Sequence, residues 1–365
     1  MNSTEACLAL NMLPTIGPVR LRKLLEVFEK PESVLSARGD KLRGVDGVGA
    51  EVAQQITNWE SLVDLSAELK RIADFGAEII TAESPMYPRV LREIHAPPIV
   101  LYVWGELTER DQHAIGIIGS RRTTHYGTES AKKLAYQLAY SGLTVVSGLA
   151  RGIDTAAHQG ALAAKGRTIA VIGSGLSHLY LPENAALAEK IRNGNGAVVS
   201  EFSMEVEPDR QTFPMRNRII SGWSQGILVV EAGLNSGALI TASQALEQGR
   251  SVYAVPGHIN APSAMGSNRL IQQGAKLVMD ASDILDDLQI LLPETKSPTP
   301  AARLLPELTA AERAVYDAIE DSETAIDAIA VRCDLPTPTV SSTLLRLELK
   351  RLVKQLPGNH FVKLA

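Results

Sequence analysis

The segment QTFPMRNRIISGWS, residues 211–224, brings together side chains that can bind a nucleic acid. The ring of Phe213 can stack on a base, and the guanidinium groups of Arg216 and Arg218 can contact phosphates. Because Pro214 follows Phe213, we expect the ring to lie in a loop and not in a helix. A packing role is also open, because the two arginines could begin a helix that buries the apolar residues after them.

Glycine and small polar residues follow four of the apolar runs between residues 114 and 257. If these runs are parallel strands, the turns lie at the carboxyl ends of the strands, where open α/β sheets bind their ligands. Glycine lets the backbone approach a ligand, and the helix N-termini that follow supply N–H donors with a partial positive charge. The pattern therefore predicts phosphate binding, with Arg121, Arg122 and Arg151 as charged neighbours. The four turns are IIGSRRT, VVSGLARGID, VIGSGLS and VVEAGLNSGALIT.

Apolar, β-branched runs alternate with helical stretches in the central part of the chain. Strands that are apolar throughout, each joined to the next by a helix, are typical of a parallel sheet with helices on both faces. The predicted fold class is therefore α/β, with an extended Rossmann-like, doubly wound, mostly parallel sheet. The predicted strands are 114–120, 143–148, 168–175, 197–202, 226–233 and 251–257, and the predicted helices include 128–141, 153–165 and 236–249.

Two smaller regions flank the predicted sheet. Residues 1–80 twice repeat a glycine turn followed by an amphipathic helix, which predicts a helical domain of the helix-hairpin-helix or SAM-like type. Such turns can offer N–H groups to a DNA phosphate. A bundle used for packing or protein contacts is favoured over this, because helix surfaces often carry positive clusters like that of Arg20, Arg22 and Lys23. Residues 81–290 then form the Rossmann-like domain, and the proline-containing residues 291–306 are typical of a linker. Residues 307–365 predict three helices and a hairpin, which is a winged-helix arrangement.

Charge and cysteine content limit the class of protein. The chain has 365 residues and a net charge of −5, so any anion site must be a local concentration of donors. Cys7 and Cys333 are the only cysteines, which argues for a reducing compartment and against a disulfide or a zinc site. The N-terminus lacks the features of a signal peptide, and no apolar run is long enough to span a bilayer. We therefore expect a cytoplasmic protein.

The ordered motifs of this sequence resemble those of the DNA-processing protein A family, also called DprA or Smf. The resemblance extends over most of the chain, and the number of motifs makes it specific for the central region. The N-terminal helices and the winged-helix region also resemble the family. The motifs are YPRVLREIHAPPIVLYVWG, GSRRTTHYG, SGLARGIDTAAHQGAL, AVIGSGL, YLPEN, EF, FPMRNRIISGWS, VVEAGLNSGALITASQALEQGRSVYAVPG and GSNRLIQQGA.

The resemblance implies a DNA-binding protein of natural transformation and homologous recombination, without catalytic residues, cofactor or metal. Such a protein protects incoming single-stranded DNA, forms a homodimer through its Rossmann-like domain and helps to load the RecA recombinase. A single-strand-binding protein is a further candidate partner, and no membrane contact is implied.

The resemblance also implies where the DNA binds. The segment YLPEN has Pro182 where many relatives carry a basic residue, which removes one expected phosphate partner. Weaker affinity, or a larger share for the arginines of the first turn, would follow. The implied DNA-binding residues are Gly119, Ser120, Arg121, Arg122, Gly173, Ser174, Gly175, Phe213, Arg216, Asn217 and Arg218.

A nucleotide-binding protein or an enzyme of the phosphoribohydrolase type is the main alternative. The turn EAGLNSGALIT is similar to the phosphoribosyl-binding loop of those enzymes, and Glu231 could act on a glycosidic centre. Against this, no acid follows the loop until Glu247. A dehydrogenase is disfavoured, because arginines replace the third glycine of the dinucleotide fingerprint. A triad of Ser147, Asp154 and His158 lacks a G-x-S-x-G elbow, and the spacing of its last two members favours a local ion pair.

The winged-helix region carries a basic series. Arg346, Lys350 and Lys354 recur every fourth residue, so we expect them to form one edge of its third helix, suited to phosphates. Many acidic residues surround this edge, and protein contact or self-regulation therefore fits as well as duplex binding. The pattern predicts no sequence-specific readout.

Overall fold

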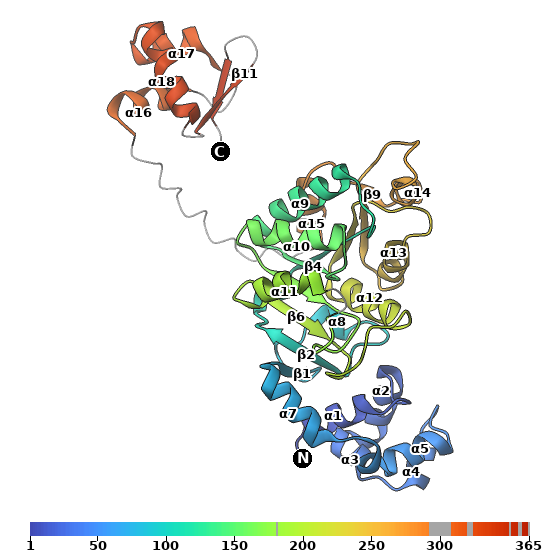
Figure 1. Cartoon of the computed structure of the whole chain (residues 1–365). Helices are drawn as coiled ribbons and strands as arrows, with labels where there is room; N and C mark the ends of the chain where they lie inside the picture. The colour runs from blue at the N-terminus through green and yellow to red at the C-terminus, as the bar shows by residue number, and fades with distance from the viewer. Residues whose placement is uncertain (180–181, 292–307, 320–323, 350–351, 357–359, 364–365) are drawn as a thin grey trace. The chain divides into compact units, whose positions relative to one another are not determined.

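The computed structural model describes residues 1–179, 182–291, 308–319, 324–349, 352–356 and 360–363. The chain divides into two compact units, Met1–Leu292 and Pro293–Ala365 (Figure 1). The domain boundary predicted at residue 80 falls inside the first unit and stays a prediction. Most of the predicted linker, 292–306, lies outside the described residues.

A mixed sheet forms the centre of the first unit. Its described strands are β1 (Glu78–Thr81), β2 (Val100–Gly105), β3 (Ala114–Ile118), β4 (Thr144–Ser147), β5 (Thr168–Val171), β6 (Gly196–Ser200), β7 (Gly226–Val229), β8 (Ser251–Ala254) and β9 (Lys276–Leu277). The strand order is β1-β2-β6-β5-β4-β3-β7-β8-β9, and β3 to β9 pair in parallel. The six predicted strands are confirmed as β3 to β8. The antiparallel strands β1, at the edge, and β2, beside it, lie outside the predicted alternation of strands and helices.

The strand order reverses between β3 and β7. From β3 the chain passes through β4, β5 and β6 on one side, and then returns to β7 on the other side of β3. Parallel pairing places the carboxyl ends of these strands at one edge of the sheet. The crevice above such a reversal is where open α/β sheets bind their ligands.

Helices cover both faces of the sheet, as the doubly wound prediction requires. Strand β3 shows how the sequence divides between them: Ile115 and Ile117 belong to one apolar core, and Ala114 and Ile118 belong to the other. The first core is shared with α9 (His125–Tyr140), α10 (Ile153–Ala163) and α15 (Ser282–Leu291), and the second with α8 (Arg89–Arg92), α12 (Thr212–Trp223) and α13 (Gly237–Glu247). The remaining helices here are η1 (Glu109–Gln112), η2 (Pro182–Asn184), α11 (Ala185–Arg192) and α14 (Met265–Gln272).

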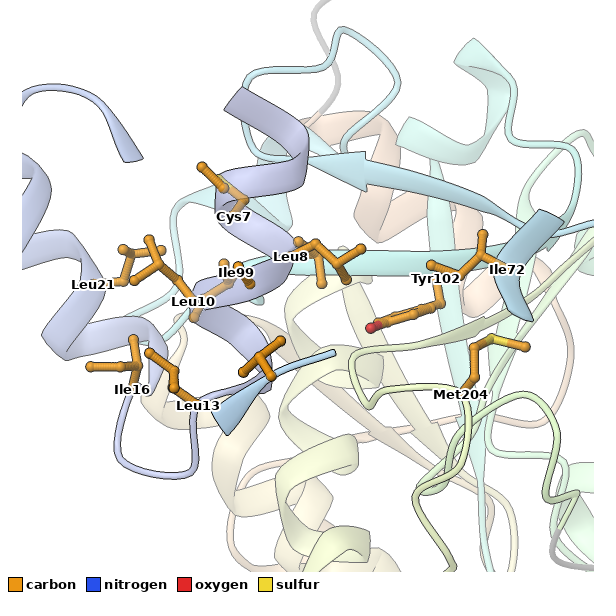
Figure 2. Close-up of a cluster of buried hydrophobic side chains, with 14 of the residues drawn as sticks. Cys7, Leu8, Leu10, Leu13, Ile16, Leu21, Ile72, Ile99, Tyr102 and Met204 are labelled. Carbon is orange, nitrogen blue, oxygen red and sulfur yellow. The ribbon is translucent and has the colours of Figure 1, made fainter. Parts of the chain in front are cut away.

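The N-terminal helices share a core with the sheet. Figure 2 shows Leu8 and Ile72 close to Tyr102 of β2 and to Met204, and all four side chains belong to one buried cluster. Within it, the buried Glu68 carboxylate accepts hydrogen bonds from the Tyr102 hydroxyl (2.9 Å) and the Met204 N–H (2.8 Å). These helices are α1 (Ser3–Met12), α2 (Pro18–Phe28), α3 (Pro31–Leu35), α4 (Gly39–Arg43), α5 (Ala50–Thr57), α6 (Trp59–Leu62) and α7 (Leu65–Phe75).

The two glycine turns of this region precede α2 and α5, as predicted. The basic residues beside them contact the protein itself. The Arg20 Nε donates to the Gly47 carbonyl (3.0 Å), Lys23 forms an ion pair with Asp46 (2.5 Å), and Arg22 donates to a backbone carbonyl. Of the two interpretations left open by the sequence, these contacts support packing.

The second unit contains three described helices and a small antiparallel sheet, in agreement with a winged helix. Its elements are α16 (Ala310–Ala318), β10 (Thr324–Ala325), α17 (Ile326–Cys333), α18 (Thr337–Leu349), β11 (Val353–Leu356) and β12 (His360–Lys363). Strands β11 and β12 form the predicted hairpin, whose tip lies outside the described residues.

The predicted basic edge of the third helix is wrong at Lys354. Helix α18 ends at Leu349, and Lys354 lies on β11, where it pairs with residue 362 of β12. The physical reason is Val353, which is fully buried in the core of this unit and draws the chain into the sheet. Arg346 is exposed on α18, and Lys350 lies outside the described residues.

Candidate nucleic-acid interface

A cavity of about 830 Å³ lies where the strand order reverses. The β3–α9 turn, the start of α12 and the β7–α13 turn line it, as expected for ligand binding at this edge. Of the ionisable side chains that line this cavity in the described chain, four are arginines and one is an aspartate, so the pocket favours anions. They are Arg121, Arg122, Arg210, Arg216 and Asp154.

Arg121 and Phe213 form a stacked pair at this cavity. The guanidinium carbon of Arg121 lies 4.9 Å from the centre of the Phe213 ring, within the range of a cation–π contact. A Cβ atom built on Gly173 would lie 3.1 Å from the ring, so the glycine lets the ring pack on the backbone after β5. The stack offers a flat apolar face and a positive charge together.

The expectation that Phe213 lies in a loop is wrong. Helix α12 begins at Thr212, so Phe213 and Pro214 both occupy its first turn. A proline is tolerated there, because the N–H groups of the first turn have no partner within the helix in any case. Phe213 therefore projects from a rigid element.

Arg216 is a buried guanidinium in the wall of the pocket. Only 5% of the residue is exposed, its Nη1 donates to the Val171 carbonyl at the end of β5 (2.7 Å), and its Nε has no hydrogen-bond partner in the described structure. Burial lowers the pKa of Arg216 to about 10, although the charge of Asp154 opposes this shift. The group therefore stays charged at neutral pH, with one donor unused.

Asp154 is the carboxylate that balances Arg216. Burial raises the pKa of Asp154, while the charge of Arg216 and hydrogen bonds from the backbone act in the opposite direction. The N–H of Gly148 donates to Asp154 (3.2 Å). Asp154 is thus held by the β4–α10 turn, and the pair fixes the guanidinium in place.

Arg218 does not reach the pocket. It makes two hydrogen bonds with the Glu201 carboxylate (2.8 and 2.6 Å), and both side chains are largely buried. Burial raises the pKa of Glu201, and the charge of Arg218 opposes that rise. This ion pair links α12 to the residue after β6, so a phosphate contact by Arg218 stays a prediction that its position does not support.

Of the other predicted residues, some line the pocket and some do not. Gly119, Ser120, Arg122 and Asn217 line the cavity together with Arg121, Phe213 and Arg216, and Gly173 lines a smaller cavity beside it. Ser174 is fully buried and its hydroxyl donates to the His178 carbonyl (2.5 Å). A Cβ atom at Gly175 would overlap the carbonyl oxygens of residues 203 and 204. Ser174 and Gly175 therefore stabilise the conformation of the loop in which they lie.

Glu183, next to Pro182 in the sequence, forms an ion pair with Arg151. The backbone of this residue begins η2. The neighbouring Glu183 accepts a hydrogen bond from Nη2 of Arg151 (3.0 Å), so the arginine of the second glycine turn has a carboxylate partner.

Two groups of pocket residues were not selected from the sequence. Arg210 lies just before the aromatic segment, but its charge alone gave no signal beside the other arginines. Asn235 and Ser236 lie in a turn that the glycine pattern did identify, and Gly237 begins the helix α13 that follows it. The Ser236 hydroxyl accepts from the N–H of residue 238 (3.3 Å) and caps α13, so this helix N-terminus faces the cavity.

Glu231, the carboxylate that an enzyme would need, is not among the residues that line the cavity. It accepts hydrogen bonds from the Thr123 hydroxyl (2.7 Å) and the Thr124 N–H (2.9 Å), and its backbone carbonyl accepts from Ser120 (2.7 Å). Burial raises the pKa of Glu231, but hydrogen bonds from Ser263, Thr123 and Thr124 outweigh burial and hold the pKa below 4.5. Glu231 thus supports the β3–α9 turn.

Glu231→Gln is expected to lower the free energy of unfolding by about 1–2 kcal/mol at pH 7, because hydrogen bonds to an ionised acceptor are the stronger ones. A carboxyl with a lowered pKa stabilises the fold above its unfolded pKa and loses this contribution as the pH falls through its folded pKa. The difference between parent and variant should therefore shrink below pH 4.5, measured by urea unfolding across pH. A difference that grows on acidification contradicts this role.

The residues of the alternative triad do not meet. The Ser147 hydroxyl donates to the Ile117 carbonyl (2.6 Å), and the His158 Nδ1 pairs with the Thr168 hydroxyl (2.7 Å). Burial, together with the charge of Arg216, lowers the pKa of His158 to about 3. The imidazole is therefore neutral at ordinary pH, and the predicted ion pair with Asp154 is wrong.

No described helix is long and apolar enough to cross a membrane. The described part of the chain also contains no group of three or more His, Cys, Asp or Glu side chains arranged to hold a metal ion.

Comparison with known proteins gives one consistent family. The DNA recombination-mediator protein A family matches residues 78–289, a DprA winged-helix domain matches 299–359, and a SAM-like helix-hairpin-helix tandem matches 8–58. Protein Smf of Synechocystis is 35% identical over 394 residues, which cover 99% of each chain. DprA of Bacillus subtilis is 45% identical over 214 residues, 58% of this chain and 72% of that protein.

Solved structures agree with these relatives. The X-ray structure of DprA from Streptococcus pneumoniae gives a TM-score of 0.70 at 34% identity, covering 78% of this chain and 98% of that one. A structure that addresses the single-stranded DNA binding mode of DprA from Helicobacter pylori gives 0.53 at 28% identity, covering 59% and 98%. The sheet, the glycine turns, the flanking domains and these matches together show that the chain belongs to the DNA recombination-mediator protein A family, which includes the DprA and Smf proteins.

Proposed function

We propose that the pocket binds single-stranded DNA without sequence preference. The observation that carries the proposal is the Arg121–Phe213 stack beside the buried Arg216, on a pocket lined by glycine turns. A ring that takes any base and guanidinium groups that take any phosphate give affinity without readout of sequence. The Helicobacter pylori relative, whose structure addresses single-stranded DNA binding, supports this proposal.

In this proposal different parts of the pocket bind different groups of the DNA. A base stacks on Phe213, and backbone phosphates meet Arg122, the Ser120 turn and the N-terminus of α13. Arg216 adds a fixed positive charge, and its unused Nε is a donor for an oxygen of the ligand. Duplex DNA binds less well, because its bases are already stacked and cannot enter.

We propose binding and not hydrolysis as the role of this site. The carboxylate that lines the pocket, Asp154, is engaged by the Gly148 N–H and by the charge of Arg216. The alternative enzyme needs Glu231, which supports a turn instead. The description of the family as a recombination mediator also supports a role in binding.

The wider role follows as part of the proposal. We infer that the protein protects incoming single-stranded DNA in the cytoplasm, forms a homodimer and helps to load RecA during transformation or recombination. The names of the DprA relatives and the family description support this role. Light scattering of the purified chain tests the dimer. Assembly of RecA on DNA coated with single-strand-binding protein, with and without this chain, tests the loading step.

Phe213→Ala is expected to weaken binding of a labelled oligothymidine by about tenfold, the loss of one stacked base. Arg121→Ala should also weaken binding and reduce its salt dependence, because one phosphate or base contact by a cation is lost. Fluorescence anisotropy over a salt series measures both. The matched control is Arg110→Ala, an exposed arginine that precedes β3 at the opposite edge of the sheet.

Competition separates the proposal from its alternative. Unlabelled duplex and nucleoside monophosphates should displace the oligothymidine poorly. If a monophosphate displaces the oligothymidine tightly and Phe213→Ala has no effect, a small-molecule or enzymatic function would be favoured over DNA binding.

A further inference from the structure

The exposed aromatic side chains of the described structure all lie on one helix, α9. Tyr126, Tyr136 and Tyr140 are 55%, 43% and 67% exposed, whereas the described tryptophan and phenylalanine side chains are buried or half-buried. A chain with only 4% aromatic residues thus leaves three rings in water on a single element. Exposed aromatic side chains gathered in this way mark binding surfaces.

Two of these rings are already arranged for stacking. Tyr136 and Tyr140 lie one helical turn apart, with ring centres 6.1 Å apart and planes that differ by 5°. The hydroxyl of Tyr126 donates to the Pro256 carbonyl (3.0 Å), which fixes the third ring. Rings that are ordered before binding cost little entropy when a partner stacks on them.

This surface continues from the DNA pocket along the chain. Helix α9 is capped by Thr124, directly after the turn that contributes Ser120, Arg121 and Arg122 to the cavity. Its 16 residues extend for about 24 Å. At about 3.4 Å per nucleotide, a stacked strand covers that length with about seven nucleotides. A groove of about 280 Å³ between α9 and α10 runs beside Tyr136.

The charges on this surface nearly cancel. Lys132 forms an ion pair with Glu129 (3.1 Å), and Lys133 interacts electrostatically with Asp280. Attraction of phosphates therefore contributes little here, and the rings are the main source of affinity. Bases of a single strand present the flat, apolar faces that such rings bind.

We propose that Tyr136 and Tyr140 of α9 form a second contact for single-stranded DNA, which binds the strand after it leaves the pocket. This inference rests on the proposed function of the pocket and extends its DNA-binding surface along the α9 face. The second contact acts by stacking, and the pocket acts by stacking and charge. The two contacts therefore differ in their dependence on strand length and on salt.

The test compares a Tyr136→Ala/Tyr140→Ala double variant with the parent, using oligothymidines of about four and about twenty nucleotides. The short strand should bind both proteins equally, because it fills only the pocket. The long strand should bind the double variant about tenfold more weakly, by the same factor at every salt concentration. Tyr136→Phe/Tyr140→Phe should restore binding, since it keeps the rings. Val27→Ala, at a residue that is 60% exposed on α2, is the control for loss of exposed apolar surface.

The outcomes separate this proposal from that of the pocket. If neither strand binds the parent, the proposed function fails, and the second contact fails with it. If the parent binds the long strand no more tightly than the short one, or if the double alanine variant binds both as the parent does, the second contact alone is overturned. A change in the mass of the protein by light scattering, without a change in binding of the long strand, assigns the tyrosines to a contact between proteins and also overturns it.

Discussion

Arg216→Ala is expected to lower the free energy of unfolding by about 3 kcal/mol and to abolish tight binding of single-stranded DNA. The loss of stability arises because Asp154 then stays buried without the opposite charge that balances it, and the Val171 carbonyl loses its donor. The loss of binding arises because the pocket loses its fixed cation. Urea unfolding measures the first effect, and anisotropy with an oligothymidine measures the second.

A second substitution separates the two losses. Asp154→Asn removes the uncompensated charge and keeps an oxygen that can accept from Gly148. In the Arg216→Ala/Asp154→Asn variant we therefore expect much of the stability to return while DNA binding stays weak. If the single Arg216 variant is as stable as the parent, or if the double variant binds DNA normally, the role assigned to this pair is incorrect.

Gly148→Ala is expected to cost about 1–3 kcal/mol of stability and to weaken DNA binding strongly. A Cβ atom at this position would overlap the guanidinium group of Arg216 and come within 2.7 Å of a carboxylate oxygen of Asp154. Both groups are buried among packed elements, so neither can move aside without loss of its hydrogen bonds. Thermal unfolding and the same anisotropy assay measure the two effects.

Gly237→Ala is the matched control for this substitution. Gly237 also lines the cavity, at the first residue of α13, but a Cβ atom there meets no atom within 4 Å. We expect this variant to be as stable as the parent, so it tests whether an added methyl group at the pocket is destabilising by itself. Equal losses of stability in both variants would contradict the specific role of Gly148.

The sheet and its glycine turns could be predicted from the sequence because both depend on local composition. Apolar runs of strand length and the small residues after them are visible without knowledge of what they touch, and β3 to β8 followed from them. Strands β1 and β2 pair antiparallel and do not fit the alternation, so the same pattern did not find them.

The roles of individual side chains were harder to predict, as Arg216 and Arg218 show. They lie two residues apart on one helix, so they point to different sides of it. Arg216 meets Asp154 in the first turn of α10, and Arg218 meets Glu201 after β6. Neither partner is near the arginines in the sequence. The same is true of Glu231, whose partners Thr123 and Thr124 lie more than 100 residues away.

The shared core of Figure 2 bears on any attempt to divide this chain by truncation. The loop that leads from β6 to Phe213 includes Met204. The Met204 side chain packs in the core shared with the N-terminal helices, and its N–H donates a hydrogen bond to Glu68. The side-chain amide of Asn11 in α1 donates a hydrogen bond to the Glu201 carbonyl (3.0 Å), near the start of the same loop. Removal of the first 77 residues would take away these two anchors and expose Tyr102 to water. The helical region thus supports the loop that leads to the pocket, and we expect a truncated chain to preserve the site when it keeps the whole first unit.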